Sequence, residues 1–321
     1  MPAPSTAAEK RIRSLIRLTP LSQSSLRTGS SNGRVFLKLE NLQETGAFKL
    51  RGAANKLLSL PQEQAVRGII AASTGNHAIA VATIGQKLGI SVEIFVSEQL
   101  HPLKRAKIES LGARLRTVSG DALLAEQTAR QEAERAGRAY VSPYNDADVI
   151  AGQGTVAVEL RDQLREHGVD KLDAIFVAVG GGGLIGGIGA HLKDESPHTQ
   201  VVGCWPENSP ALYECIRAGA VIDVPERPTL STSTAGGVED GSITLELCRR
   251  VIDRSVLVSE AEILAAARLI WRAENMLIEG AAAVAVAAYL KTAAEYAGKN
   301  VVIVICGGNV DAAVEALIKE S

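Results

Sequence analysis

The most constraining feature of this chain is a regular alternation of short strand-like runs with longer segments of helical periodicity. The strand-like runs are rich in β-branched residues and lie at residues 34–40, 67–73, 91–97 and 113–119, and again at 172–179, 200–206 and 299–308. The segments between them carry apolar residues at helical spacing, and several end at glycine. This alternation predicts an α/β fold with parallel sheets covered by helices on both faces.

The alternation is interrupted near residues 140–148, "YVSPYNDAD", where Pro, Asn and Asp break the pattern. With 321 residues, the chain is long enough for one large domain or two medium ones. We therefore expect two open, mostly parallel sheets, one of which contains the four-strand run between about residues 59 and 146.

Charge and hydropathy exclude several classes of partner. The formal net charge is −2 and no basic block is present, so neither nucleic acid nor an anionic membrane is expected as a partner. The most apolar run, "GAAAVAVAAYL" at 280–290, is too short to span a bilayer and predicts a buried helix instead. A globular enzyme or binding protein fits this composition.

The cysteines and the N-terminus bear on the compartment. Cys204, Cys215, Cys248 and Cys306 form no CxxC pair, which favours a reducing compartment and argues against a structural zinc site. The first 20 residues lack the apolar core of a secretory signal. Their Arg-rich amphipathic character weakly resembles a transit peptide, but Glu9 counts against that, so we expect a cytoplasmic protein without a metal site.

Three strand ends are candidate sites, because parallel sheets bind ligands at the carboxyl ends of their strands. At residues 71–78, "AASTGNHA", the chain leaves a strand through Ser73, Thr74 and Gly75 and enters a helix near Asn76 and His77. Hydroxyls and free backbone N–H groups at a helix start can bind a carboxylate or a phosphate. The same residue types also make an ordinary helix cap, and the sequence leaves both interpretations open.

The second strand end is "VAVGGGGLIGGIGA" at 177–190. Four consecutive glycines, Gly180, Gly181, Gly182 and Gly183, predict a phosphate-binding loop, and the helix that begins near Leu184 adds its dipole. At the third, a strand ends in Cys306-Gly307-Gly308-Asn309, where the thiol is either a buried apolar group or a weak hydrogen-bond partner.

Two charged residues stand in apolar surroundings. Lys49, in "ETGAFKLRGA" at 44–53, follows Phe48 at an expected helix start. It is either a solvated helix lysine or a nucleophile held beside a flat group. Glu279 borders the apolar helix in "MLIEGAAA" and should be paired or functional.

The glycine loop supports two cofactors. Gly181-x-Gly183-x-x-Gly186 matches a dinucleotide fingerprint, with Glu207 at roughly the position of a ribose-binding acid, so an NAD-dependent oxidoreductase is one alternative. That alternative leaves Lys49 and the 73–77 segment without a role. Pyridoxal 5′-phosphate uses all three features, because it has an aldehyde for the lysine, a flat ring for Phe48 and a phosphate for the glycines.

The motifs "GAFKLRGA", "STGNHA", "GGGGL" and "CGGNVD", in this order, resemble the fold-type II (tryptophan synthase β-like) pyridoxal-phosphate enzymes, from about Thr19 to the C-terminus. They are most similar to the threonine/serine dehydratase and serine racemase branch. The resemblance implies a homodimer, a large cofactor-binding domain at residues 1–58 and 147–321, a small domain at 59–146, and the cofactor between them.

The resemblance also implies a role for each candidate residue. Lys49 would hold the cofactor as a Schiff base, and Phe48 would lie against its ring. The other expected cofactor contacts are Asn76 at the ring hydroxyl, Gly180, Gly181, Gly182, Gly183 and Leu184 at the phosphate, Cys306 at the pyridine nitrogen, and Glu279 near the ring. Ser73, Thr74, Gly75 and His77 would line the substrate carboxylate pocket, with Thr74 also at the catalytic position.

The implied reaction is elimination of water from a β-hydroxy amino acid, which yields a 2-oxo acid and ammonia. The alternatives are an amino acid racemase on the same scaffold and a non-catalytic binding protein, which the retained lysine argues against. Residues 234–248 resemble dehydratases of hydroxyectoine breakdown more than threonine dehydratases, but this likeness is local. Four substrates therefore stay open: serine, threonine, 3-hydroxyaspartate and a hydroxylated diamino acid. The acidic metal ligands of serine racemase would align with Trp205 and Ala211, which cannot coordinate a cation, although Glu207 leaves room for a shifted site.

Overall fold

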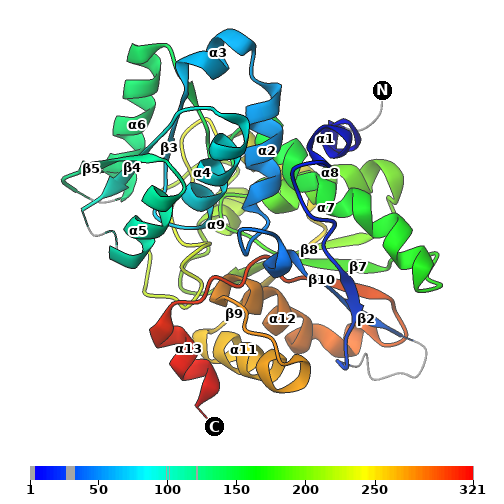
Figure 1. Ribbon diagram of the computed structural model, residues 1–321. Coiled ribbons are helices and arrows are strands. Elements are labelled where there is room, and N and C mark those ends of the chain that lie inside the picture. Colours follow the sequence, from blue (N-terminus) through cyan, green and yellow to red (C-terminus); the bar gives the residue numbers. More distant parts are fainter. Residues whose placement is uncertain (1–3, 27–32, 99, 101, 121, 321) are drawn as a thin grey trace.

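The computed structural model describes residues 4–26, 33–98, 100, 102–120 and 122–320 and contains two separate sheets (Figure 1). The larger sheet has six strands in the order β1-β2-β10-β7-β8-β9, all parallel except β1. These strands are β1 (Leu21–Gln23), β2 (Val35–Lys38), β7 (Ala174–Ala178), β8 (Gln200–Pro206), β9 (Arg254–Val258) and β10 (Val301–Val304). The predicted α/β class with mostly parallel sheets is confirmed.

The smaller sheet has four parallel strands in the order β5-β4-β3-β6. They are β3 (Ile69–Ala72), β4 (Val92–Ser97), β5 (Arg114–Val118) and β6 (Ala139–Tyr140). Alternate residues of a strand point to opposite faces: Ile70 and Phe95 pack on α6 (Ala122–Ala136), while Ile69 and Ile94 pack with α4 (Asn76–Leu88). α5 (Pro102–Ser110) lies beside α4.

The larger sheet is also covered on both faces. In Figure 1, α11 (Glu260–Glu274), α12 (Gly280–Thr292) and α13 (Ala312–Lys319) lie below it, and α1 (Pro4–Ile12), α7 (Ala147–Glu166) and α8 (Gly183–Glu195) lie above it. α12 is buried from Gly280 to Tyr289, as its alanine-rich sequence predicts, because small side chains allow close packing on the strands. The remaining short elements are η1 (Glu40–Leu42), α3 (Gln62–Arg67), α9 (Ala211–Ala218), α10 (Ile243–Val251) and η2 (Ala293–Tyr296).

Helix α2 (Lys49–Ser59) joins the two halves. Its apolar residues Leu50, Ala53 and Leu57 belong to the same hydrophobic cluster as the small sheet and Val149 of α7. The four strands of the small sheet all fall within residues 59–146, and the six others fall outside that range. The exact domain boundaries stay a prediction.

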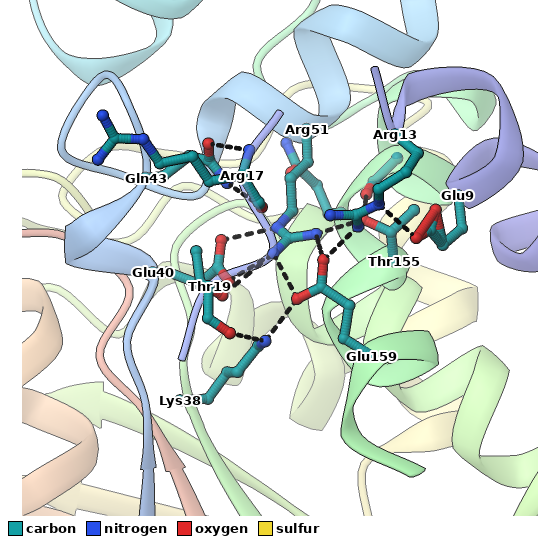
Figure 2. A network of polar contacts seen from close by, with 12 residues as sticks. Glu9, Arg13, Arg17, Thr19, Lys38, Glu40, Gln43, Arg51, Thr155 and Glu159 are labelled. Carbon is teal, nitrogen blue, oxygen red and sulfur yellow. Dashed lines mark hydrogen bonds and ion pairs between the residues drawn. The ribbon is translucent and has the colours of Figure 1, made fainter. Parts of the chain in front are cut away.

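A buried polar network anchors the first turns of α2 (Figure 2). The guanidinium of Arg51, which is fully buried, donates to both oxygens of Glu40 at 2.7 and 2.8 Å and to both oxygens of Glu159 at 2.8 and 2.9 Å. The amine of buried Lys38 donates to Glu159 and to the backbone oxygen of Thr19, the latter at 2.8 Å. Two buried cations, with the partly exposed Arg13 also paired to Glu159, thus neutralise two carboxylates between β2, η1, α2 and α7.

The charges in this network stabilise one another. Burial disfavours the Arg51 cation, but Glu40 and Glu159 outweigh burial and raise the pKa of Arg51. Burial alone would raise the pKa of Glu159, but Arg51 and Lys38 lower it to about 2. Because Arg51 lies two residues after Lys49, the network holds the helix start that presents this lysine.

Candidate active site

The candidate residues meet at the carboxyl ends of strands from both sheets. The glycine loop follows β7, Cys306 follows β10, and Ser73 follows β3. Backbone contacts join the C-terminal segment to the turn before Lys49: the amide of Phe48 donates to the oxygen of Cys306 at 3.1 Å, and that of Gly308 donates to Gly46 at 2.9 Å.

Lys49 is the first residue of α2 and is half-buried. Its Nζ donates to the backbone oxygen of Pro143 at 2.8 Å and lies 5.1 Å from the centroid of the Phe48 ring. Loss of hydration on burial lowers the pKa of Lys49 to about 8, although Cys306 and Glu279 oppose the shift. This amine is therefore partly unprotonated near neutral pH, which a solvated helix lysine is not.

Glu279 and Cys306 are both buried. Burial raises the pKa of Glu279 to about 7, and hydrogen bonds from Asn76 and Ser233 and the charge of Lys49 limit the rise. Burial, and then the Glu279 charge, raise the pKa of the Cys306 thiol well above its usual range, so it stays neutral. Gly307 packs directly against this carboxylate, since a Cβ there would lie 2.5 Å from Glu279 Oε1.

The segment from Ser73 to His77 forms the start of α4. The Ser73 hydroxyl accepts the Gly75 amide at 3.2 Å, and a Cβ at Gly75 would enter open space. Thr74 is half-buried. His77 is buried, and its Nε2 lies 2.8 Å from the oxygen of Val141. Burial, and then the Lys49 charge, lower the pKa of His77 to about 3, so the ring stays neutral and Nε2 is the donor to that carbonyl.

The glycine loop presents free backbone amides. The carbonyl of Gly181 accepts the Thr244 hydroxyl at 2.7 Å, and that of Gly182 accepts the Cys248 thiol at 3.6 Å. Among the described residues, no acceptor pairs with the amides from Gly180 to Gly183. Gly182 has a φ of 88° and precedes α8, whose second residue is Leu184.

No side chain fits on this loop. A Cβ at Gly181 would lie 2.4 Å from the Tyr144 ring, and one at Gly180 would lie 3.0 Å from the backbone of Thr234. Glycines that are packed this closely, with unpaired amides at a helix start, fit the phosphate of a cofactor. The lysine amine of lowered pKa and the neutral thiol fit the aldehyde and the ring nitrogen of pyridoxal phosphate.

Residues 141–146 were predicted only as a break between the two halves, yet they contact most parts of the site. Besides the carbonyls of Val141 and Pro143, the Tyr144 hydroxyl accepts the Glu239 amide at 3.0 Å, and Asn145 Oδ1 accepts the Ile243 amide at 2.9 Å. The sequence signal that could have marked this segment is Pro143 followed by the aromatic Tyr144, shortly after the strand β6.

The residues considered for other cofactors do not form a second site. Glu207 is half-exposed and lies 3.8 Å from Lys291. Trp205 is fully buried, with its ring 5.5 Å from that of Tyr213 and folded onto Gly203. Within the described ranges, no cluster of three His, Cys, Asp or Glu residues could hold a metal ion, and no helix is long and apolar enough to cross a membrane.

Known proteins share this architecture. Residues 12–307 match the family described as "Pyridoxal-phosphate dependent enzyme". The L-threonine ammonia-lyase of Thermotoga maritima is 37% identical over 304 residues, which are 95% of this chain and 74% of that protein. The beta-hydroxyaspartate dehydratase of Paracoccus denitrificans is 33% identical over 95% of both chains. The crystal structure of serine racemase from Dictyostelium discoideum superposes with a TM-score of 0.87 at 32% identity and covers 96% of this chain and 98% of its own.

Proposed function

The chain belongs to the pyridoxal-phosphate dependent enzymes, and from that premise we propose that it is a dehydratase that eliminates water from a threonine- or serine-like β-hydroxy amino acid. The products are a 2-oxo acid and ammonia. That the enzyme is a pyridoxal-phosphate-dependent lyase follows from its family and its ammonia-lyase relatives. The NAD-dependent alternative is not retained.

One observation carries the proposal: a lysine whose pKa is lowered to about 8 interacts with a neutral thiol and donates to Pro143, and the next residue, Tyr144, packs on a loop of free glycine amides. In the proposed site the amides from Gly180 to Gly183 and Leu184 bind the cofactor phosphate, Cys306 meets the ring nitrogen and Phe48 lies against the ring. Asn76 meets the ring hydroxyl, and Glu279 lies nearby.

Bound pyridoxal phosphate withdraws electrons from the substrate α-carbon, which makes its proton removable. Lys49 takes that proton on Nζ, because an amine with a pKa of about 8 is a competent base near neutral pH. The same proton can then return from Nζ to the β-hydroxyl, which leaves as water. Ser73, Thr74 and Gly75 hold the substrate carboxylate at the start of α4. His77 can add only its backbone amide, because the one N–H of its neutral ring donates to Val141.

The names of the relatives support a β-hydroxy amino acid as the class of substrate. L-threonine and β-hydroxyaspartate are the compounds named in two of the enzymes that resemble this chain over 95% of its length. Both carry a hydroxyl on the β-carbon, which is the leaving group that the proposed reaction needs. Serine and a hydroxylated diamino acid meet the same requirement. The homodimer, the cytoplasmic location and the absence of a metal stay predictions.

Racemisation is the second candidate, because a serine racemase shares this fold. It requires an acid–base group on the ring face opposite Lys49, and Thr74 is the residue proposed there. The extra methyl of threonine restricts χ1 and crowds the α-carbon, so its hydroxyl suits carboxylate binding better than proton transfer. We therefore expect elimination to exceed racemisation.

The test incubates the purified, cofactor-loaded enzyme with L-serine, L-threonine and 3-hydroxyaspartate. A coupled assay follows the 2-oxo acid, and chiral chromatography follows the D-enantiomer. We expect 2-oxo acid from at least one substrate, and loss of both the visible absorbance and the activity in Lys49→Ala. D-product that forms faster than 2-oxo acid would overturn the dehydratase assignment, whereas Thr74→Ser should raise the D-product share.

A further inference from the structure

Asn309 links three segments that meet at the site. It follows β10, and its Nδ2 donates to the backbone oxygen of Thr45 at 2.9 Å and to Oδ1 of Asn76 at 2.7 Å. Thr45 lies in the turn before Lys49, and Asn76 begins α4 beside the small sheet. The contact between Asn309 and Asn76 spans 233 residues of sequence.

The chemistry of these partners fixes the direction of each amide. A backbone carbonyl can only accept, so Asn309 must turn its NH2 group toward Thr45. The second hydrogen of that group is donated to Asn76, which must accept it with Oδ1. Asn76 Nδ2 consequently faces Glu279, where it lies 2.9 Å from Oε2 and 3.2 Å from Oε1. The oxygen and nitrogen of both amides are thus assigned by their partners and not by shape.

Packing holds Asn309 in this position. A Cβ at Gly46 would lie 2.7 Å from Asn309 Oδ1, and Gly46 has a φ of +77°, where a larger residue is strained. The Asn309 amide therefore lies directly against the glycine backbone. The Gly308 amide, next to it in sequence, donates to the Gly46 oxygen and fixes the same turn from the other side.

The direction of the Asn76 amide matters for the cofactor. Its Nδ2 lies within hydrogen-bond distance of both Glu279 oxygens. The two N–H bonds of an amide diverge too widely to point at one carboxylate, so the two oxygens share one hydrogen and the other is available to a further acceptor. A reversed Asn76 would offer lone pairs instead of a donor. We infer that Asn309 is a positioning residue that keeps the Asn76 NH2 group turned toward the pyridoxal phosphate pocket, so that Asn76 donates to the ring oxygen.

This inference rests on the proposed role of Asn76 and is tested by Asn309→Asp, which keeps the shape of the side chain. A carboxylate cannot donate to Thr45 or to Asn76, so Asn76 reverses to donate to it. The ring oxygen then loses the donor that stabilises its anion. We expect about tenfold weaker binding of pyridoxal phosphate, equivalent to about 1.4 kcal/mol. We also expect a higher pH midpoint for the visible absorbance change of the lysine-bound cofactor.

Three further variants make the test specific. Asn76→Ala should produce the same two changes, and the Asn76→Ala/Asn309→Asp double variant should be no worse than Asn76→Ala alone, because both act through one donor. Asn309→Ala removes both hydrogen bonds without adding charge and should shift the midpoint in the same direction. The matched control is Asn300→Asp. The Nδ2 of Asn300 also donates to a backbone carbonyl, that of Lys171 at 3.2 Å, and its replacement should leave the midpoint unchanged.

The inference is overturned if Asn309→Asp lowers only the melting temperature and leaves the midpoint unchanged, since that result means a purely structural tether. Additive effects in the double variant would also overturn it. Both readouts need no substrate, so a failed dehydratase assay leaves this test valid.

Discussion

Lys49 and Glu279 set the electrostatic character of the site, because burial moves both pKa values toward neutrality. Lys49 falls to about 8 and Glu279 rises to about 7. The two groups also interact, since each opposes the shift of the other. Near pH 7 the pair therefore holds an intermediate number of protons, which suits a site that must accept and return one.

The raised pKa of Glu279 predicts a pH-dependent cost in stability. The folded protein retains this proton between about pH 4.5 and 7, while the unfolded chain has lost it, so the folded state binds more protons and stability falls as pH rises through that window. Glu279→Gln stays neutral and avoids the cost. With the cofactor removed, we expect its free energy of unfolding to exceed that of the wild type at pH 8 by up to about 3 kcal/mol, with no gain at pH 4.5.

Urea denaturation at both pH values measures this difference. Glu274→Gln is a suitable control, because its carboxylate also accepts from a serine hydroxyl, that of Ser24 at 2.6 Å. An equal effect of Glu279→Gln at both pH values would contradict the argument.

The segment from Val141 to Asp146 makes polar contacts with parts of the site on both sheets. It receives hydrogen bonds from His77, Lys49 and the Glu239 amide, and its Asp146 caps α7 by accepting from two backbone amides. The Tyr144 ring covers Gly181. The segment thus ties the lysine, the glycine loop and the start of a long helix to one short stretch of chain.

Two substitutions distinguish the role of the Tyr144 hydroxyl from that of its ring. Tyr144→Phe loses only the bond from the Glu239 amide, so we expect a loss of about 1 kcal/mol in stability and normal retention of the cofactor. Tyr144→Ala removes the ring from the glycine loop and opens it to water. We expect at least tenfold weaker cofactor binding, or about 1.4 kcal/mol, measured by dialysis and absorbance. Equal cofactor retention in both variants would exclude a role of the ring.

The buried network around α2 predicts a larger loss of stability. Glu159→Gln leaves the cations of Arg51 and Lys38 without one of their two carboxylates, and an uncompensated buried charge costs about 3 kcal/mol or more. Glu166→Gln, on the same helix but exposed, should leave the urea midpoint unchanged. Equal midpoints for the two variants would show that the Glu159 charge contributes no net stability.

The fold was largely predictable because parallel strands that are buried on both faces are mostly apolar runs, as in β2, β3, β4, β7, β8 and β10. These strands lie within predicted ranges, and so does β5, an exposed edge strand whose Leu, Thr and Val were the signal. Three strands were missed: β1 and β6 are very short, and β9 (RSVLV) begins with arginine and serine. The pairing of strands, and not local pattern, creates these elements.

The candidate site was predictable where its chemistry lies within one segment. A run of four glycines and a lysine beside an aromatic ring are visible locally, and the family and its cofactor are confirmed by the match over residues 12–307. Asn309 was quoted in a motif without a role, because its partner Asn76 is 233 residues away. Pro143 contributes a backbone carbonyl, which no sequence pattern marks. The roles proposed for the individual residues stay predictions.

Polar contacts join the small sheet to the loops of the large one. Besides the bonds of Asn76, the guanidinium of Arg130, on α6, pairs with Glu239 in the segment between α9 and α10. Arg130 also donates to Glu126 at 3.1 Å and lies 4.3 Å from the centroid of the Tyr140 ring. One cation thus serves two carboxylates, one on each side of the junction.

This pair predicts measurable coupling between the two parts of the molecule. Because the Arg130 side chain is 35% exposed and that of Glu239 18%, solvent screening limits the coupling free energy to about 1 kcal/mol. In a double-mutant cycle, Arg130→Gln and Glu239→Gln should be non-additive by that amount. Added salt at about 0.5 M should reduce this coupling free energy. Hydrogen exchange in Arg130→Gln should accelerate in both 122–136 and 231–242. Arg135→Gln, on the same helix but paired with Glu132 of that helix, should leave 231–242 unchanged. Faster exchange confined to α6 in Arg130→Gln would mean that the ion pair does not couple the sheets.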